Sequence, residues 1–284
     1  MVILAVIGLY IWSISRVPTK LELYVFNTKG KPSIFIRTPQ DERVLINGGA
    51  NGDIIRYLTK VIPFYSRRID TVILTNDITN NVTGLIDIVN RYKIGSVIIP
   101  TLTMRDLGSA SSTDQIYGAF IDAVNAQGIL IKEVTRGDEL NFSGLKIEIL
   151  FPVSVNEFAY SKASGPELVL KISYGSCSFL LIGDASTKIQ KFIVQNSSTN
   201  TLADSLSSNV LIIPHGASAS SLSLDLVNTV RPEFIVYSQS VASGKSTSKK
   251  VDPLYMILKD HRFNIQQKNT VKVFSDGESV QIRE

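Results

Sequence analysis

Three apolar runs in this sequence each end in polar residues whose side chains could bind a metal, hold a substrate or move a proton. Thr75-Asn76-Asp77 follows the first run, Gly183-Asp184 follows the second, and Pro214-His215-Gly216 follows the third. Strand ends position ligands in α/β proteins, because a rigid strand fixes the loop that leaves it. A turn residue that caps a helix would explain any one of these ends. Together, the three ends predict a shared pocket.

Few residues in the chain could bind a catalytic zinc. Such a site needs about three protein ligands and a water, and the ligands are mostly His with Asp or Glu. The sequence has two histidines, His215 and His261, and one cysteine, Cys177. Cys177 lies in an apolar run and is expected to be a small core residue without a disulfide. We therefore expect no zinc, and a single hard cation on Asp77, Asp184 and asparagine carbonyls is the alternative.

Catalysis without a metal has little support in the sequence. The hydroxyls of Ser218–Ser221 lie close in sequence to His215, but the chain has no Gly-x-Ser-x-Gly elbow and no identified carboxylate to orient that histidine. Acid–base chemistry needs two carboxylates at the same strand ends, and only Asp77 and Asp184 qualify.

The elements that must position these residues begin with short β-branched runs, which predict thirteen strands. These strands are Leu21–Phe26, Ser33–Arg37, Arg43–Ile46, Thr71–Thr75, Ser96–Pro100, Ile129–Glu133, Leu145–Phe151, Leu168–Ser173, Ser178–Ile182, Val210–Ile213, Glu233–Tyr237, Val271–Phe274 and Ser279–Ile282. So many strands require two sheets.

Helical patterns lie between several of these strands. We predict helices over Gly84–Tyr92, Asp114–Ala126, Thr187–Gln195 and Ser221–Thr229, and a last one over Asp252–Asp260 with Asp252 as N-cap and Pro253 at its first position. Clusters of strands with interleaved helices indicate an α/β sandwich with sheets inside and helices outside.

The N-terminal residues form a separate unit. Val2–Ile14 carries no charge and is followed by Arg16 and Lys20. This run is shorter than the roughly 20 residues that span a bilayer, and it has neither a basic n-region nor an Ala-x-Ala cleavage site. We predict an uncleaved membrane anchor or signal-like segment over residues 1–16, and a buried N-terminal strand is the alternative. A net charge of +4 would suit a polyanion or an anionic membrane, but the charges are spread along the chain.

Six segments resemble motifs of one family. Val25–Pro39 is similar to its opening strand and Asp-Val-Gly-Gln-Gly-Asp turn, and Leu45–Gly49 to its Ile-Asp-Gly-Gly element. Ile69–Thr75 leads into the place of its His-x-His-x-Asp-His motif, and Gly84-Leu85 follows as Gly-Gly-Leu does. Leu181–Ala185 is similar to its Thr-Gly-Asp-Ala strand, and Ile213–Ser218 to its Pro-His-His-Gly-Ser. From about Leu21 to the C-terminus, the chain resembles the metallo-β-lactamase-fold domain of the ComEC-type DNA-uptake family. The resemblance implies a metallo-β-lactamase-like αββα sandwich over residues 20–284, with two mixed sheets inside and helices outside.

The residues that bind zinc in the resembled family are mostly absent. Asp184 persists, and His215 falls on the first histidine of the later motif, with Gly216 in place of the second. Lys31-Pro32 replaces the Gly-Asp of the opening turn. The expected degenerate pocket consists of Asn27, Asn47, Asn76, Asp77, Ile78, Asn80 and Asn81, with Asp184 and His215 as remnants. Two remnants cannot hold two metals, so we expect no cofactor.

The resemblance implies a membrane-tethered, catalytically inactive module linked to DNA uptake, with its domain on the extracytoplasmic side. Arg16 and Lys20 point to the opposite side by the positive-inside tendency. The alternatives are a metal-dependent hydrolase or nuclease with a rebuilt mononuclear site, and a structural envelope protein. Weak, salt-dependent contacts with DNA phosphates are expected at Arg67, Arg68, Lys245, Lys249 and Lys250, and scattered solvated charges are the alternative reading of these residues.

Overall fold

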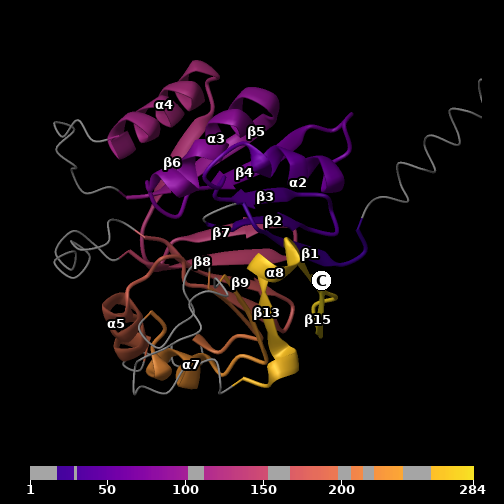
Figure 1. Ribbon diagram of the computed structural model, residues 1–284, viewed down its shortest axis with the longest axis vertical. Helices are drawn as coiled ribbons and strands as arrows, with labels where there is room; N and C mark the ends of the chain where they lie inside the picture. The colour runs from indigo at the N-terminus through magenta and orange to yellow at the C-terminus, as the bar shows by residue number, and fades with distance from the viewer. Residues whose placement is uncertain are drawn as a thin grey trace, which may run out of the picture.

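Two β-sheets form the centre of the molecule (Figure 1). The computed structural model describes residues 18–28, 31–101, 112–152, 167–197, 206–213, 221–238 and 257–284. The predicted anchor, most of the predicted Asp252–Asp260 helix, and the predicted DNA contacts Lys245, Lys249 and Lys250 lie outside these ranges. Among the residues described, no helix is long and apolar enough to span a bilayer.

The first sheet has eight strands in the order β15-β14-β1-β2-β3-β4-β5-β6. They are β1 (Leu21–Phe26), β2 (Ser33–Arg37), β3 (Arg43–Ile46), β4 (Arg68–Ile73), β5 (Lys93–Pro100), β6 (Leu130–Val134), β14 (Thr270–Ser275) and β15 (Val280–Arg283). Pairing is antiparallel from β15 to β3 and parallel from β3 to β6. Therefore β3, β4 and β5 all end at the same edge of the sheet.

The second sheet has seven strands in the order β13-β12-β11-β10-β9-β8-β7. They are β7 (Glu139–Phe142), β8 (Leu145–Phe151), β9 (Val169–Tyr174), β10 (Cys177–Leu181), β11 (Val210–Ile213), β12 (Phe234–Tyr237) and β13 (Arg262–Asn264). Strands β10 to β13 are parallel, and the rest of the sheet is antiparallel.

The period-2 alternation of the strands decides how the layers pack. In β1, Leu23 and Val25 face the second sheet, whereas Tyr24 and Phe26 face the helices. Both sets are buried, because each sheet is covered on both faces. Strands of this kind appear in the sequence as nearly continuous apolar runs.

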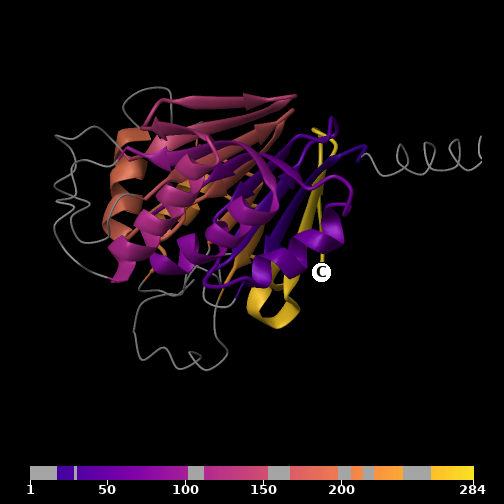
Figure 2. The same cartoon turned by 90° about the horizontal axis from the view of Figure 1, so that it is seen from above.

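Helices cover the two outer faces. Helices α2 (Asp53–Val61), α3 (Thr79–Arg91) and α4 (Ser112–Ala126) pack on the first sheet, while α5 (Thr187–Ser197) and α7 (Leu224–Val230) pack on the second. Figure 1 shows these groups on opposite sides of the sheets, and in Figure 2 α2 and α3 lie in front of the first sheet. The layer order is helix, sheet, sheet, helix, as predicted.

Some predicted boundaries were wrong. Helix α2 was missed, although Ile54, Tyr57 and Leu58 form its buried face. The short strands β7 and β13 and the one-turn helix α8 (Ile265–Lys268) were also missed. Helix α3 begins at Thr79 rather than Gly84, α7 begins at Leu224 rather than Ser221, and β4 ends at Ile73 rather than Thr75. The described end of the predicted Asp252–Asp260 helix is a 3₁₀ turn, Lys259–His261.

Candidate functional site

A cluster of buried polar side chains lies where the two sheets meet at their strand ends. Asn76 follows β4, Asp184 follows β10, Glu167 precedes β9, and Lys31 lies in the turn between β1 and β2. The backbone N–H of Leu168 donates to the Thr75 carbonyl at 2.8 Å and holds the two sheets together here. We call Lys31, Asn76, Asn81, Glu167 and Asp184 the strand-end cluster.

Lys31 and Asp184 form an ion pair at the edge of this cluster. The Lys31 ammonium donates to Asp184 Oδ2, and the two side chains are only 12% and 14% exposed. The Thr28 hydroxyl donates to the Lys31 carbonyl at 2.5 Å and fixes the base of the turn. A salt bridge with so little access to water is a strong electrostatic contact, because solvent screens it weakly.

Glu167 is fully buried next to this pair. The Asn76 amide donates to Glu167 Oε2 and, at 3.1 Å, to Asp184 Oδ2. Burial, followed by the negative charge of Asp184, raises the pKa of Glu167 well above its ordinary value. Gly183 makes room for this carboxyl, because its φ is +54° and a Cβ there would fall 1.9 Å from Glu167 Oε1. Glu167 therefore keeps its proton to a higher pH than an ordinary glutamate does.

Asparagine amides tie the loop after β4 together. Asn81 Nδ2 donates to Asn76 Oδ1 at 2.6 Å, and the backbone N–H of Ile78 donates to the same oxygen at 3.1 Å. Asn76 therefore accepts two hydrogen bonds and donates two, which uses its amide fully. This arrangement positions the Asn76 amide between the two carboxylates.

A second asparagine joins the ends of β3 and β4. Asn47 has a left-handed backbone with φ of 60°, and its Oδ1 accepts the Thr75 backbone N–H at 2.9 Å. Its Nδ2 donates to the Thr75 hydroxyl at 3.0 Å. The next residue, Gly48, lies against the start of α3, where a Cβ on Gly84 would come within 2.0 Å of the Gly48 carbonyl oxygen. Gly48 and Gly84 thus allow the close approach of the loop after β3 to α3.

The structure brings together some of the residues predicted for the pocket and separates others. Asn76, Asp77 and Asn81 are buried at the strand ends, and Asp184 contacts Asn76. Asn80 is exposed, and Asn27 is half-buried with its carbonyl accepting from the Tyr57 hydroxyl at 2.9 Å. His215 lies outside the described residues.

The donor atoms of the cluster do not fit zinc. Asp184 is paired with an ammonium, the raised pKa of Glu167 disfavours the ionised carboxylate that a metal needs, and the asparagine amides are weak neutral ligands. Within the described ranges, no group of three or more His, Cys, Asp or Glu residues could hold a metal ion. The described part of the cluster is therefore a hydrogen-bonding network around one ion pair.

Sequence reasoning missed two members of the cluster as site residues. Lys31 was noted only as a replacement in the opening turn, and Glu167, which directly precedes an apolar run, was not singled out. The available signal was a lone charge directly before a strand that is buried on both faces. Such charges are rarely buried without a partner, so a charge at this place indicates a polar contact.

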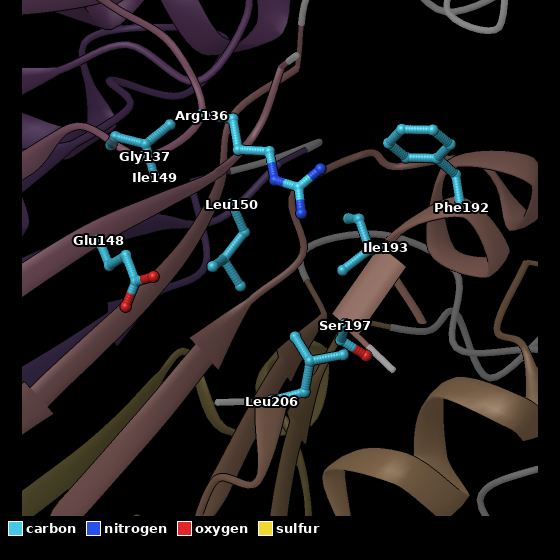
Figure 3. Close-up of a pocket in the computed structure, with 9 residues that line it drawn as sticks. All are labelled: Arg136, Gly137, Glu148, Ile149, Leu150, Phe192, Ile193, Ser197 and Leu206. Atoms are coloured by element: carbon cyan, nitrogen blue, oxygen red, sulfur yellow. The ribbon is translucent and has the colours of Figure 1, made fainter. Parts of the chain in front are cut away.

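A separate pocket of about 130 Å³ lies between β8 and α5, away from the predicted site residues (Figure 3). Apolar side chains such as Leu150, Ile193 and Leu206 line it, and the Arg136 guanidinium points toward them. None of the residues predicted from the sequence contributes to this lining, so the pocket adds no chemistry to the strand-end cluster.

Comparison with known proteins supports the predicted family resemblance. The chain is 24% identical over 190 residues to ComE operon protein 3 of Bacillus subtilis (strain 168), a match that covers 66% of this chain. The same match covers only 22% of that protein, so this chain spans about a fifth of its length. No family model matches the chain.

Two solved structures share the fold. YhfI from Bacillus subtilis, a metallo-β-lactamase-fold protein, aligns with a TM-score of 0.50 and 9% identity, covering 77% of this chain and 85% of YhfI. A mutant of the β-hydroxylase CmlA from Streptomyces venezuelae aligns with a TM-score of 0.50 and 14% identity, covering 78% of this chain and 46% of CmlA. The predicted metallo-β-lactamase-like sandwich and the resemblance to the ComEC-type family are confirmed.

Proposed function

We propose that this chain is a catalytically inactive, membrane-tethered metallo-β-lactamase-fold module of the ComEC type. The observation that carries the proposal is the ion pair between Lys31 and Asp184. Asp184 is the one residue of the resembled metal motifs that clearly persists among the described residues, and its negative charge is already balanced by a tethered ammonium.

The chemistry of the resembled family depends on a metal that lowers the pKa of a bound water. In this chain an ammonium contacts the retained carboxylate, and an ammonium can neither accept a lone pair nor activate water as a Lewis acid. Asn76 uses its amide on Asn81 and the two neighbouring carboxyl groups, and Asn81 Nδ2 donates to Asn76, whereas the buried Asn81 Oδ1 accepts no hydrogen bond from the described residues. The cluster therefore stabilises the strand ends and offers no nucleophile.

A metal-dependent hydrolase with a rebuilt mononuclear site is the second candidate. The observation in its favour is Glu167, a carboxylate next to Asp184 that sequence reasoning did not anticipate. This candidate requires Lys31 to leave Asp184 and the Asn76 amide to turn its Oδ1 toward the carboxylates, so that all three groups offer oxygens to one hard cation.

Activity of the full chain separates the two candidates. We expect no hydrolysis of DNA or of a phosphodiester substrate with Zn²⁺, Mn²⁺ or Mg²⁺, and no difference between the native chain and Asp184→Asn. Hydrolysis that depends on added metal and disappears in Asp184→Asn would establish the mononuclear enzyme instead.

Tethering and nucleic-acid binding rest on the sequence. The uncharged run Val2–Ile14 supports a membrane anchor, and the resemblance to a DNA-uptake family supports an extracytoplasmic domain that contacts DNA. Of the five predicted DNA contacts, Arg67 and Arg68 are described and exposed, and Arg68 already pairs with Asp70 at 3.3 Å. DNA binding should accordingly be weak and should fade as salt rises toward physiological concentration, which titration of labelled oligonucleotides measures.

A further inference from the structure

Two exposed aromatic side chains project from the turn between α2 and β4. Phe64 is 79% exposed and Tyr65 is 50% exposed, and their rings meet edge to face with centroids 5.5 Å apart. Exposing two large aromatic rings to water is unfavourable, and a partner that covers them removes this apolar surface from water. Such pairs therefore mark interaction surfaces.

The turn that carries these rings is fixed by hydrogen bonds from a buried arginine side chain. Arg43 is only 2% exposed, and its Nη1 donates to the Ser66 carbonyl at 2.6 Å and to the Arg68 carbonyl at 3.2 Å. Asp41 holds the other end of the guanidinium through Nη2 at 2.6 Å. A preorganised turn loses little conformational entropy when a partner binds.

Basic side chains lie at the same edge of the sheet as the aromatic pair. Arg67, Arg91 and Lys93 are all exposed, and the Lys93 backbone N–H donates to the Arg67 carbonyl at 2.9 Å. Arg91 is the last residue of α3, two positions before Lys93 at the start of β5. Two carboxylates beside the turn, those of Asp41 and Asp70, are paired with Arg37, Arg43 and Arg68. We call Phe64, Tyr65, Arg67, Arg91 and Lys93 the basic-aromatic edge.

The chain enters the fold at this same edge. Strand β1 runs parallel to β3, β4 and β5, because β2 is antiparallel to both of its neighbours. The starts of all four strands therefore lie at one edge of the sheet, opposite the strand-end cluster. Strands lie about 4.8 Å apart, which puts the start of β1 roughly 15 Å from the start of β4. Lys20, just before β1, follows the uncharged run Val2–Ile14 by only five intervening residues.

We infer that the basic-aromatic edge rests on an anionic lipid surface, and this inference depends on the proposed membrane tether. A short connection from the apolar run to β1 keeps this edge within reach of the bilayer. Aromatic side chains favour the headgroup region, and arginine and lysine bind anionic headgroups there. The strand-end cluster then faces away from the membrane.

The competing occupant of this edge is single-stranded nucleic acid. Its bases stack on open ring faces, and the edge-to-face contact between Phe64 and Tyr65 removes one of these faces. The position of the edge beside the start of β1 also favours lipid, because a tethered domain meets the bilayer at high effective concentration.

Site-specific fluorescence of the full chain in vesicles tests the inference. A polarity-sensitive label is attached to Phe64→Cys, and the matched control carries it on Asn80→Cys, an exposed site at the opposite edge. The native Cys177 is 1% exposed and stays unlabelled. Vesicles of phosphatidylcholine with or without phosphatidylglycerol are used, and vesicle flotation measures the tether separately.

We expect the label at residue 64, but not at residue 80, to shift to the blue and to be quenched by spin-labelled lipid in vesicles containing phosphatidylglycerol. Adding Arg67→Ser or Arg91→Ser should weaken this contact by roughly fivefold for each cation removed. A chain that floats with vesicles without any response at residue 64 would overturn the inference and leave the tether intact. A chain that does not float would overturn both. A response at residue 64 to a single-stranded oligonucleotide but not to anionic vesicles would assign the edge to nucleic acid and overturn the inference.

Discussion

Replacing Lys31 by methionine keeps the length of the side chain and removes its ammonium. The Asp184 carboxylate then retains the Asn76 amide at 3.1 Å but loses its balancing charge, and the Glu167 carboxyl remains beside it. Removing one partner of a fully buried ion pair costs about 3–5 kcal/mol of folding stability. Because Lys31 and Asp184 are 12% and 14% exposed, water screens the orphaned charge in part, and we expect about 2–3 kcal/mol.

Chemical denaturation of the full chain in one detergent measures this loss. Asp184→Asn supplies the other arm of a double-mutant cycle, because the combined variant leaves no unpaired charge. We expect the combined variant to recover roughly 2 kcal/mol relative to the sum of the single changes. A Lys31→Met chain within about 0.5 kcal/mol of the native chain would refute the reasoning, because surface substitutions without a partner give changes of that size.

The same variant should also respond to cations. Without the ammonium, the Asp184 and Glu167 carboxyl groups that share the Asn76 amide lie close together, and oxygens of this kind suit a hard cation. Calcium or magnesium should therefore raise the thermal midpoint of Lys31→Met and leave that of the native chain unchanged. A larger cation effect on the native chain than on the variant would show that Lys31 does not occupy this place.

Three further predictions concern the supports of the cluster. Glu167→Gln should match the native chain near pH 5 and exceed its stability near pH 8. The raised pKa of Glu167 makes the native chain lose stability as pH rises above about 4.5. Urea midpoints at the two pH values that diverge in the opposite sense would contradict this. Asn76→Ala should lower the free energy of unfolding, measured with urea, by about 2 kcal/mol, while the exposed control Asn80→Ala changes it by less than about 0.5 kcal/mol. Equal effects would contradict a structural role of the Asn76 amide. Gly84→Ala should lower stability by about 2–4 kcal/mol in the same assay, since its Cβ would fall 2.0 Å from the Gly48 oxygen. An unchanged midpoint would show that the loop carrying Gly48 can move away.

The layers of the fold could be predicted because the strands carry their own signal. Runs such as Leu21–Phe26 and Val210–Ile213 are apolar on both faces, and their bounds match the structure. Helix α2 was missed because its apolar face has only three buried residues within nine. The short edge strand β7 has a single buried side chain, Leu140, and therefore shows no alternation.

The meeting of strand ends could also be predicted, but the partners within the cluster could not. The apolar pattern of the sequence predicts where each strand ends, and parallel pairing brings the ends of neighbouring strands to one edge of the sheet. The Lys31 to Asp184 contact joins residues 153 positions apart, and no sequence period encodes it. Likewise, Asn80 and Asn81 are adjacent and identical in type, and only the helical phase of α3 buries one and exposes the other.

The metal content of the purified full chain tests the central claim most directly. Protein prepared without chelator should contain well under one zinc per chain by elemental mass spectrometry, because at most His215 and Asp184 remain of the zinc ligands in the resembled family. Tightly bound zinc at one per chain, lost in His215→Ala, would contradict the proposal of a metal-free, inactive module.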